Sequence, residues 1–329
     1  MLVRVVVAAL LALLTVGCSE DPSRPGTPRL ASVPPEPAPP FDGTREPAEA
    51  VLSLVPQEAG VVTVTDWDQV RVQLGQPDLT SGDLMTDRLA FWQRVETEAA
   101  TLTDGLLRSD DSRLGLDYGF TQDDVDWEAR FTGEGVRGFV LALRPDLDLA
   151  GVRRAIADGV GPLAGAELRA EDHLVVSGVA DEDVWATEGG WAELVGEPAS
   201  STYLRRGCVP LAAALGPDAG VEEQEAVLQR HPVTSLEELD GFAVAFRGLD
   251  ATVRVAPGRA DLFERLRLGE DWPVADFPRT YVDGAADPAS GRIGYSVADP
   301  RAAARLALLD ELPFAVCNEV VPREEPTGL

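Results

Sequence analysis

Short segments in which apolar and polar residues alternate recur from residue 61 to residue 297. Apolar Trp127, Ala129 and Phe131 alternate with Glu128 and Arg130, a period of two that predicts a half-buried strand. The same pattern, or a short apolar run, predicts further strands at residues 61–65, 139–143, 167–170, 173–178, 242–246, 252–255, 281–285, 292–297 and 314–317. Most of these strands form pairs joined by a tight turn, which is typical of antiparallel sheets.

Helical periodicity separates the strand pairs. Between residues 85 and 99, apolar side chains recur at spacings of four and three, which predicts a helix whose core-facing stripe is Met85, Leu89, Trp92, Val95 and Ala99. Residues 260–268 also have a helical pattern. Shorter helices are predicted after the capping residues Asp66, Asp148 and Asp299.

This order of elements predicts an α+β fold, with antiparallel sheets covered by helices on one face. A strand-strand-helix-strand-strand unit occurs twice, which suggests two similar halves, residues 46–197 and 198–329. The similar segments VSGVAD (176–181) and YSVAD (295–299) fall at equivalent points of the two units. The repeat could equally be a coincidence of common elements.

The N-terminal residues follow a different pattern. A positive head that ends at Arg4 precedes an apolar run at 5–14, which matches a signal-peptide core and is too short to span a membrane. The segment LTVGC (14–18) resembles the lipobox of bacterial lipoproteins, although Thr occupies the position where Leu is usual. The resemblance implies that residues 1–17 are a cleaved signal peptide. It also implies that Cys18 is lipidated and anchors the chain to the extracytoplasmic face of the cell membrane. The alternative is an ordinary secretory signal.

Residues 18–45 combine the lipidated cysteine with a proline-rich, polar stretch, whose centre reads VPPEPAPP. Proline-rich segments adopt extended polyproline conformations and act as spacers. We therefore expect a tether between the lipid and the folded region. A ligand for a proline-binding domain is the weaker alternative.

The two other cysteines, Cys208 and Cys317, are predicted to form a disulfide, because an exported chain lives where disulfides persist. Two buried thiols are the alternative. A cysteine nucleophile would need a histidine base nearby. The only histidines, His173 and His231, stand in contexts that do not indicate such a pair.

The charge of the chain argues against nucleic acid as a partner. It has 56 Asp and Glu against 28 basic residues, a formal net charge of −28. The acidic residues are spread along the sequence, which is typical of a solvated, repulsive surface. Without a basic face, binding DNA or RNA would bring two polyanions together.

Three local motifs carry weak functional signals. GEGVRG (133–138) matches the dinucleotide fingerprint, but it lies between two predicted strands, where glycines serve a hairpin. The acidic residues Asp117, Asp123, Asp124, Asp126 and Glu128 lack the order of a calcium loop, and residues 121–124 fit a capped turn better. Trp185 and Trp191 flank Glu188-Gly189-Gly190 and could line a ligand surface, although core packing is the commoner role of such residues.

The sequence therefore predicts no catalytic, metal or cofactor site. We expect a non-catalytic binding or scaffold protein of the cell envelope, with the membrane as its partner through the lipid and a protein or small-molecule ligand of unknown identity. The alternative is an exported, carboxylate-based hydrolase, for which two carboxyl groups flank the scissile bond.

Overall fold

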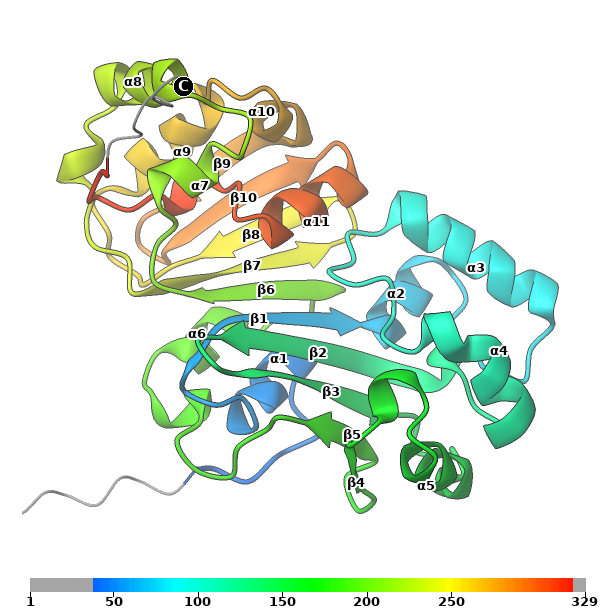
Figure 1. Cartoon of the computed structure of the whole chain (residues 1–329). Coiled ribbons are helices and arrows are strands. Elements are labelled where there is room, and N and C mark those ends of the chain that lie inside the picture. The colour runs from blue at the N-terminus through cyan, green and yellow to red at the C-terminus, as the bar shows by residue number, and fades with distance from the viewer. Residues whose placement is uncertain (1–37, 322–329) are drawn as a thin grey trace, which may run out of the picture. The chain divides into compact units, whose positions relative to one another are not determined.

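A computed structural model describes residues 38–321 (Figure 1). The predicted signal peptide, Cys18 and the tether up to residue 37 lie outside the described residues. The described residues have the predicted α+β fold, with a single antiparallel sheet of ten strands. The strands are β1 (Ala59–Asp66), β2 (Val125–Gly133), β3 (Arg137–Leu143), β4 (Glu167–Arg169), β5 (Leu174–Ser177), β6 (Ser201–Arg206), β7 (Gly241–Arg247), β8 (Asp250–Arg254), β9 (Tyr281–Asp287) and β10 (Arg292–Val297).

The sheet order shows that the two halves of the chain have the same topology. From the middle outward, the first half runs β1-β2-β3-β5-β4 and the second runs β6-β7-β8-β10-β9. The two halves meet where β1 pairs with β6, antiparallel, with Val62 opposite Leu204. Each predicted repeat therefore gains one central strand, and the repeats share one continuous sheet. The similar segments at 176–181 and 295–299 lie at the ends of the equivalent strands β5 and β10.

Helices fill the connections between the strands. They are α1 (Pro47–Ala50), α2 (Trp67–Gln73), α3 (Met85–Glu98), α4 (Asp111–Arg113), α5 (Leu149–Ala157), α6 (Trp191–Val195), α7 (Leu211–Ala214), α8 (Val221–Arg230), α9 (Leu262–Glu270), α10 (Asp276–Thr280) and α11 (Pro300–Leu308). The predicted caps are confirmed, because side chains of Asp66, Asp148 and Asp299 accept hydrogen bonds from backbone N–H groups at the starts of α2, α5 and α11.

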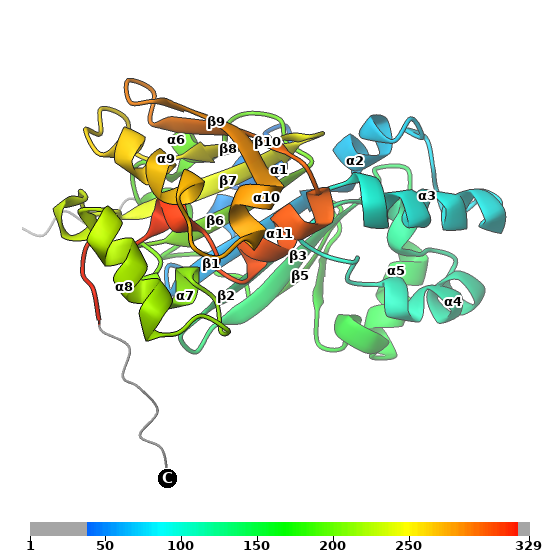
Figure 2. The ribbon, with the colours of Figure 1, turned by 90° about the horizontal axis from the view of Figure 1, so that it is seen from above.

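The two halves differ in how their faces are covered. In the first half both faces are covered: Val140 and Ala142 of β3 pack with α1 and α6, while Leu141 and Leu143 pack with α2, α3 and α5. In the second half, α7, α9 and α11 pack on one face of the sheet (Figure 2). On its other face small residues such as Thr252, Gly294 and Ser296 are partly exposed.

The predicted apolar stripe of α3 is wrong at its N-terminal end. Met85 is 60% exposed and Leu89 53% exposed, whereas Phe91, Trp92 and Val95 are buried. Arg88 turns toward the core, because its guanidinium pairs with the buried Asp123. A step of one residue rotates a helix by about 100°, so Leu89 is turned toward solvent.

The part of the predicted tether that the structure describes, residues 38–45, packs on the folded region. The ring centroid of Phe41 lies 6.4 Å from that of Trp127. Arg45 forms an ion pair with Glu49 at 2.6 Å, next to the start of α1. These contacts fix the point at which the chain enters the fold.

Candidate functional site

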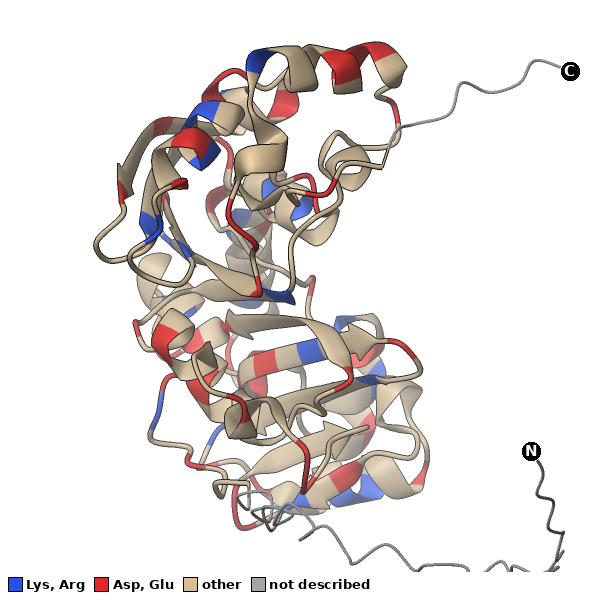
Figure 3. Cartoon of the chain, turned by 90° about the vertical axis from the view of Figure 1, so that its left-hand side faces the viewer, with Lys and Arg blue, Asp and Glu red and all other residues tan. Residues whose placement is uncertain are grey.

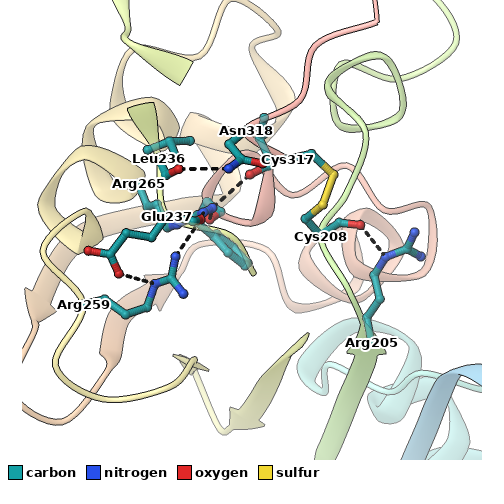
Figure 4. The surroundings of a disulfide bond; sticks show 10 residues. Arg205, Cys208, Leu236, Glu237, Arg259, Arg265, Cys317 and Asn318 are labelled. Atoms are coloured by element: carbon teal, nitrogen blue, oxygen red, sulfur yellow. Dashed lines mark hydrogen bonds and ion pairs between the residues drawn. A yellow bond between two sulfur atoms is a disulfide. The ribbon is translucent and has the colours of Figure 1, made fainter. Parts of the chain in front are cut away.

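The predicted disulfide between Cys208 and Cys317 is confirmed, with the two Cα atoms 5.0 Å apart (Figure 4). The predicted terminal strand at 314–317 is wrong. The chain forms a 3-10 turn at Pro313–Ala315, and Val316 makes a single parallel bridge to Val209. The bond therefore fastens the C-terminal segment to the segment that follows β6.

A buried arginine holds the same segment from the inside. The guanidinium of Arg265 donates to the carbonyl oxygens of Phe314 and Val316, at 2.9 and 3.0 Å, and to the carboxylate of Asp261. Arg265 is completely buried. Arg265 supplies donors to backbone carbonyls that are not paired in the sheet. Arg265, Asp261 and the disulfide therefore have a structural role, which is to hold the C-terminal segment in place.

The acidic residues near position 123 also have structural partners. Asp123 accepts from the Trp92 indole at 2.8 Å. Residues 121–124 form a capped turn, as predicted: Thr121 is the N-cap, and Asp124 accepts from the Thr121 backbone N–H. Glu128 is buried and accepts from the backbone N–H of Leu106 and from the Gln122 amide. These carboxylates are engaged in joining the loops to the sheet.

The glycine motif at 133–138 lies in the β2–β3 hairpin, as the sequence predicts. Gly133 ends β2, Gly135 takes a positive φ of 75°, and Arg137 begins β3. The motif does not open a helix, so it lacks the geometry of a dinucleotide site.

The strongest candidate for a ligand site is a cavity of about 380 Å³ beside Trp191, which we name the Trp191 cavity. It lies between the segment that leads into α6 and the ends of β6, β7, β8 and β10. Its apolar lining includes Trp191, Leu194, Val255 and Pro257, and its charged lining consists of Glu188, Glu193, Arg206, Asp240, Arg254 and Arg292.

Aromatic stacking sets one wall of the Trp191 cavity. Trp185 is fully buried, and its ring centroid lies 4.2 Å from that of Trp191. The guanidinium carbon of Arg206 lies 5.0 Å from the ring centroid of Trp185 and 5.5 Å from that of Trp191. Both tryptophans pack in the core, which is the commoner role that the sequence analysis gave them. Trp191 also lines the cavity.

Ion pairs fix the three arginines of the Trp191 cavity. Arg206 pairs with Glu188 at 2.5 Å. Glu197, in the loop between α6 and β6, pairs with both Arg254 and Arg292. The hydrogen bond from Arg254 is the largest cause that holds the pKa of Glu197 below its ordinary value. The arginines are therefore positioned before any ligand arrives.

A second cavity, of about 570 Å³, lies at the other end of β1, and we name it the Asp66 cavity. Asp66, Asp126, Trp127 and His173 line it. Burial raises the pKa of Asp66 to about 7 and that of Asp126 to about 6, and the pairing of Asp126 with Arg71 opposes this rise.

Sequence reasoning singled out Trp191 and Glu188 but missed Arg206, Arg254 and Arg292. These arginines come from three strands, and only the strand order β6-β7-β8-β10 brings them together. Acidic residues are scattered over both halves (Figure 3).

Comparison with known proteins gave no match: no family model, no curated protein and no solved structure is significantly similar to the chain. Among the helices of residues 38–321, none combines the length and the apolar character needed to cross a membrane.

Proposed function

We propose that the chain is a lipid-anchored protein of the extracytoplasmic face of the cell membrane, and that it binds a small ligand in the Trp191 cavity. The lipobox resemblance at residues 14–18 supports the anchor. The disulfide between Cys208 and Cys317 supports export, because such bonds persist in oxidising compartments.

The Trp191 cavity is the observation that carries the binding role. Its volume of about 380 Å³ falls within the range of small-molecule sites, roughly 300–1,000 Å³. An aromatic and aliphatic lining with a few fixed polar groups is typical of such sites. Because ion pairs already hold the arginines, a ligand would lose little free energy in ordering them.

The residues that line the Trp191 cavity favour ligand binding over covalent hydrolysis. Among the described lining residues, Ser290 has the only side-chain hydroxyl, and its Oγ donates to the carboxylate of Asp287 in the same turn. The lining contains no histidine or cysteine. A nucleophile and a positioned base, which covalent hydrolysis requires, are therefore not brought together there.

The test of this proposal is a fragment screen read by NMR on the purified full chain in detergent, following the indole N–H signal of Trp191. Trp191→Phe identifies that signal. A Cβ at Gly189 would meet nothing within 4 Å, so Gly189→Phe should fill the cavity without disturbing the fold. We expect fragments that shift the Trp191 signal in the wild type and not in Gly189→Phe.

The matched control for this screen is Glu225→Phe, which adds the same ring at an exposed position on α8. It should keep the response of the wild type. If no fragment shifts the Trp191 signal, or if Gly189→Phe responds like the wild type, the Trp191 cavity is not a ligand site.

The second candidate function is the carboxylate-based hydrolase, and the Asp66 cavity is the observation that favours it. Two carboxyls with raised pKa values line the same cavity, and a protonated acid beside an ionised one is the pairing used in glycoside hydrolysis. The test is release of nitrophenol from a panel of nitrophenyl glycosides. Activity that is lost in both Asp66→Asn and Asp126→Asn would establish this function.

A further inference from the structure

We propose that the ligand of the Trp191 cavity is a zwitterion of the class of short peptides, with its amino group at Glu193 and Asp240 and its carboxylate at Arg254 and Arg292. This inference rests on the proposed function, because it names the ligand of the same site. It follows from three features of the lining: the balance of its charges, their separation along the sheet, and its apolar floor.

After the ion pairs of the lining are counted, positive charge remains at one group of residues and negative charge at another. Arg206 and Glu188 neutralise each other. Arg254 and Arg292 share the single carboxylate of Glu197, which leaves about one positive charge. Within residues 38–321, the side chains of Glu193 and Asp240 form no ion pair or hydrogen bond, which leaves two negative charges. The lining is therefore dipolar.

Strand register, extended by one residue from the start of β7 to Asp240, separates the main chain of Asp240 from that of the two arginines. Arg254 lies opposite Ala243 of β7 on one side and opposite Arg292 of β10 on the other. Asp240 precedes Ala243 by three residues, which is about 10 Å along a strand. Two arginines directly opposite each other repel, and Glu197 relieves only part of that repulsion. A ligand carboxylate would relieve the rest.

The separation of about 10 Å selects the size of the ligand, because extended chains rise about 3.3 Å per residue. The termini of a peptide of two or three residues would span most of it, with the long arginine side chains closing the remaining distance. Between the charged ends, Trp191, Leu194, Val255 and Pro257 offer apolar surface for a side chain of the peptide.

The test uses four matched probes: Ala-Phe, its N-acetyl derivative, its C-terminal amide, and the form blocked at both ends. Their dissociation constants are measured by calorimetry on the purified full chain in detergent. Each free terminus should tighten binding by up to about fivefold, as expected for a partly exposed ion pair. Ala-Phe should therefore bind most tightly and the doubly blocked form least.

Variants separate the two ends. Glu193→Gln combined with Asp240→Asn should remove the preference for a free amino terminus and keep the preference for the carboxylate. Arg292→Gln, at a side chain that is 42% exposed, should remove the preference for the carboxylate and keep the preference for a free amino terminus. Glu197→Gln should strengthen the preference for the carboxylate, because it frees both arginines. Glu225→Gln, exposed on α8, is the control and should change nothing.

Equal affinities for the four probes, a preference for the doubly blocked form, or variants that leave both preferences unchanged would overturn the peptide assignment. If none of the four binds while other fragments still shift the Trp191 signal, the peptide assignment is wrong and the cavity remains a ligand site. If neither peptides nor fragments bind, the proposed function is wrong as well.

Discussion

The indole ring of Trp191 lies directly over Gly241, the first residue of β7. A Cβ at Gly241 would overlap the Cη2 atom of the ring and would lie 2.9 Å from the carbonyl oxygen of Arg205. Trp191 belongs to α6, just before the second half of the chain, and Gly241 belongs to that half. The missing side chain at position 241 thus allows the aromatic wall of the cavity to rest on the sheet.

Gly241→Ala should displace the Trp191 ring and destabilise the fold by about 1–3 kcal/mol, the usual cost of overpacking. The measurement is the free energy of unfolding in urea together with the Trp191 indole N–H signal. Gly294→Ala is the matched control, because Gly294 also lies in a strand and a Cβ there would meet nothing within 4 Å. Equal stability of the two variants would contradict the contact.

Removing the disulfide with Cys208→Ser and Cys317→Ser should lower the free energy of unfolding by up to about 4–5 kcal/mol, because the bond joins residues 109 positions apart. The unfolding transition should stay single, since the pairing of β1 with β6 couples the halves. The control is Cys18→Ser, which should leave stability unchanged. Two titratable thiols in the oxidised, unfolded Cys18→Ser chain would show that the bond does not form.

The contribution of Asp66 to the stability of the chain should fall as the pH rises from about 4 to about 7, because burial raises the pKa of Asp66 to about 7 in the folded state. The unfolded value is about 3.9, so between these values the folded state holds a proton that the unfolded state has lost, and deprotonation favours unfolding. Asp66→Asn should flatten this part of the profile and should be more stable than the wild type at pH 8.

The matched control for Asp66 is Asp148→Asn. Asp148 also caps a helix, by accepting from the backbone N–H of Ala150, but it does so from an exposed position. Its substitution should leave the slope between pH 4 and pH 7 unchanged. A pH profile of Asp66→Asn that has the same slope as that of the wild type over this range would refute the assignment to Asp66.

Cys18→Ser should abolish lipidation, because Cys18 is the cysteine of the lipobox-like segment and Cys208 and Cys317 are bonded to each other. Metabolic labelling with a fatty acid, followed by purification of the chain, measures this. Label that persists in Cys18→Ser, or that never enters the wild type, would rule out the anchor.

Most of the strands could be predicted from the sequence because their alternation is strong. The exception is β6, Ser201–Arg206, whose polar and charged residues hide a strand that is central in the sheet. The apolar run at 314–317 had the opposite effect: it predicts a strand where the structure has a 3-10 turn at Pro313–Ala315. The carbonyls of Phe314 and Val316 accept hydrogen bonds from Arg265, which lies 49 residues from Phe314 along the chain. No local sequence pattern predicts a donor so far away.

The candidate site was less predictable than the fold. Trp191 stood out because tryptophan beside Gly189-Gly190 is unusual, but nothing in the sequence around Arg254 or Arg292 links these residues to it. Their pairing through Glu197 depends on strands β8 and β10 being neighbours and on a loop from the other half reaching them. Long-range register of this kind is fixed by packing across the whole sheet.

The most direct test of the account is to identify what the chain carries when it is purified from its own cell envelope. Mass spectrometry of the small molecules released on denaturation should find a compound that is retained by the wild type and by Glu225→Phe and is absent from Gly189→Phe. Identical sets of molecules from all three proteins would contradict the assignment of the Trp191 cavity as the binding site.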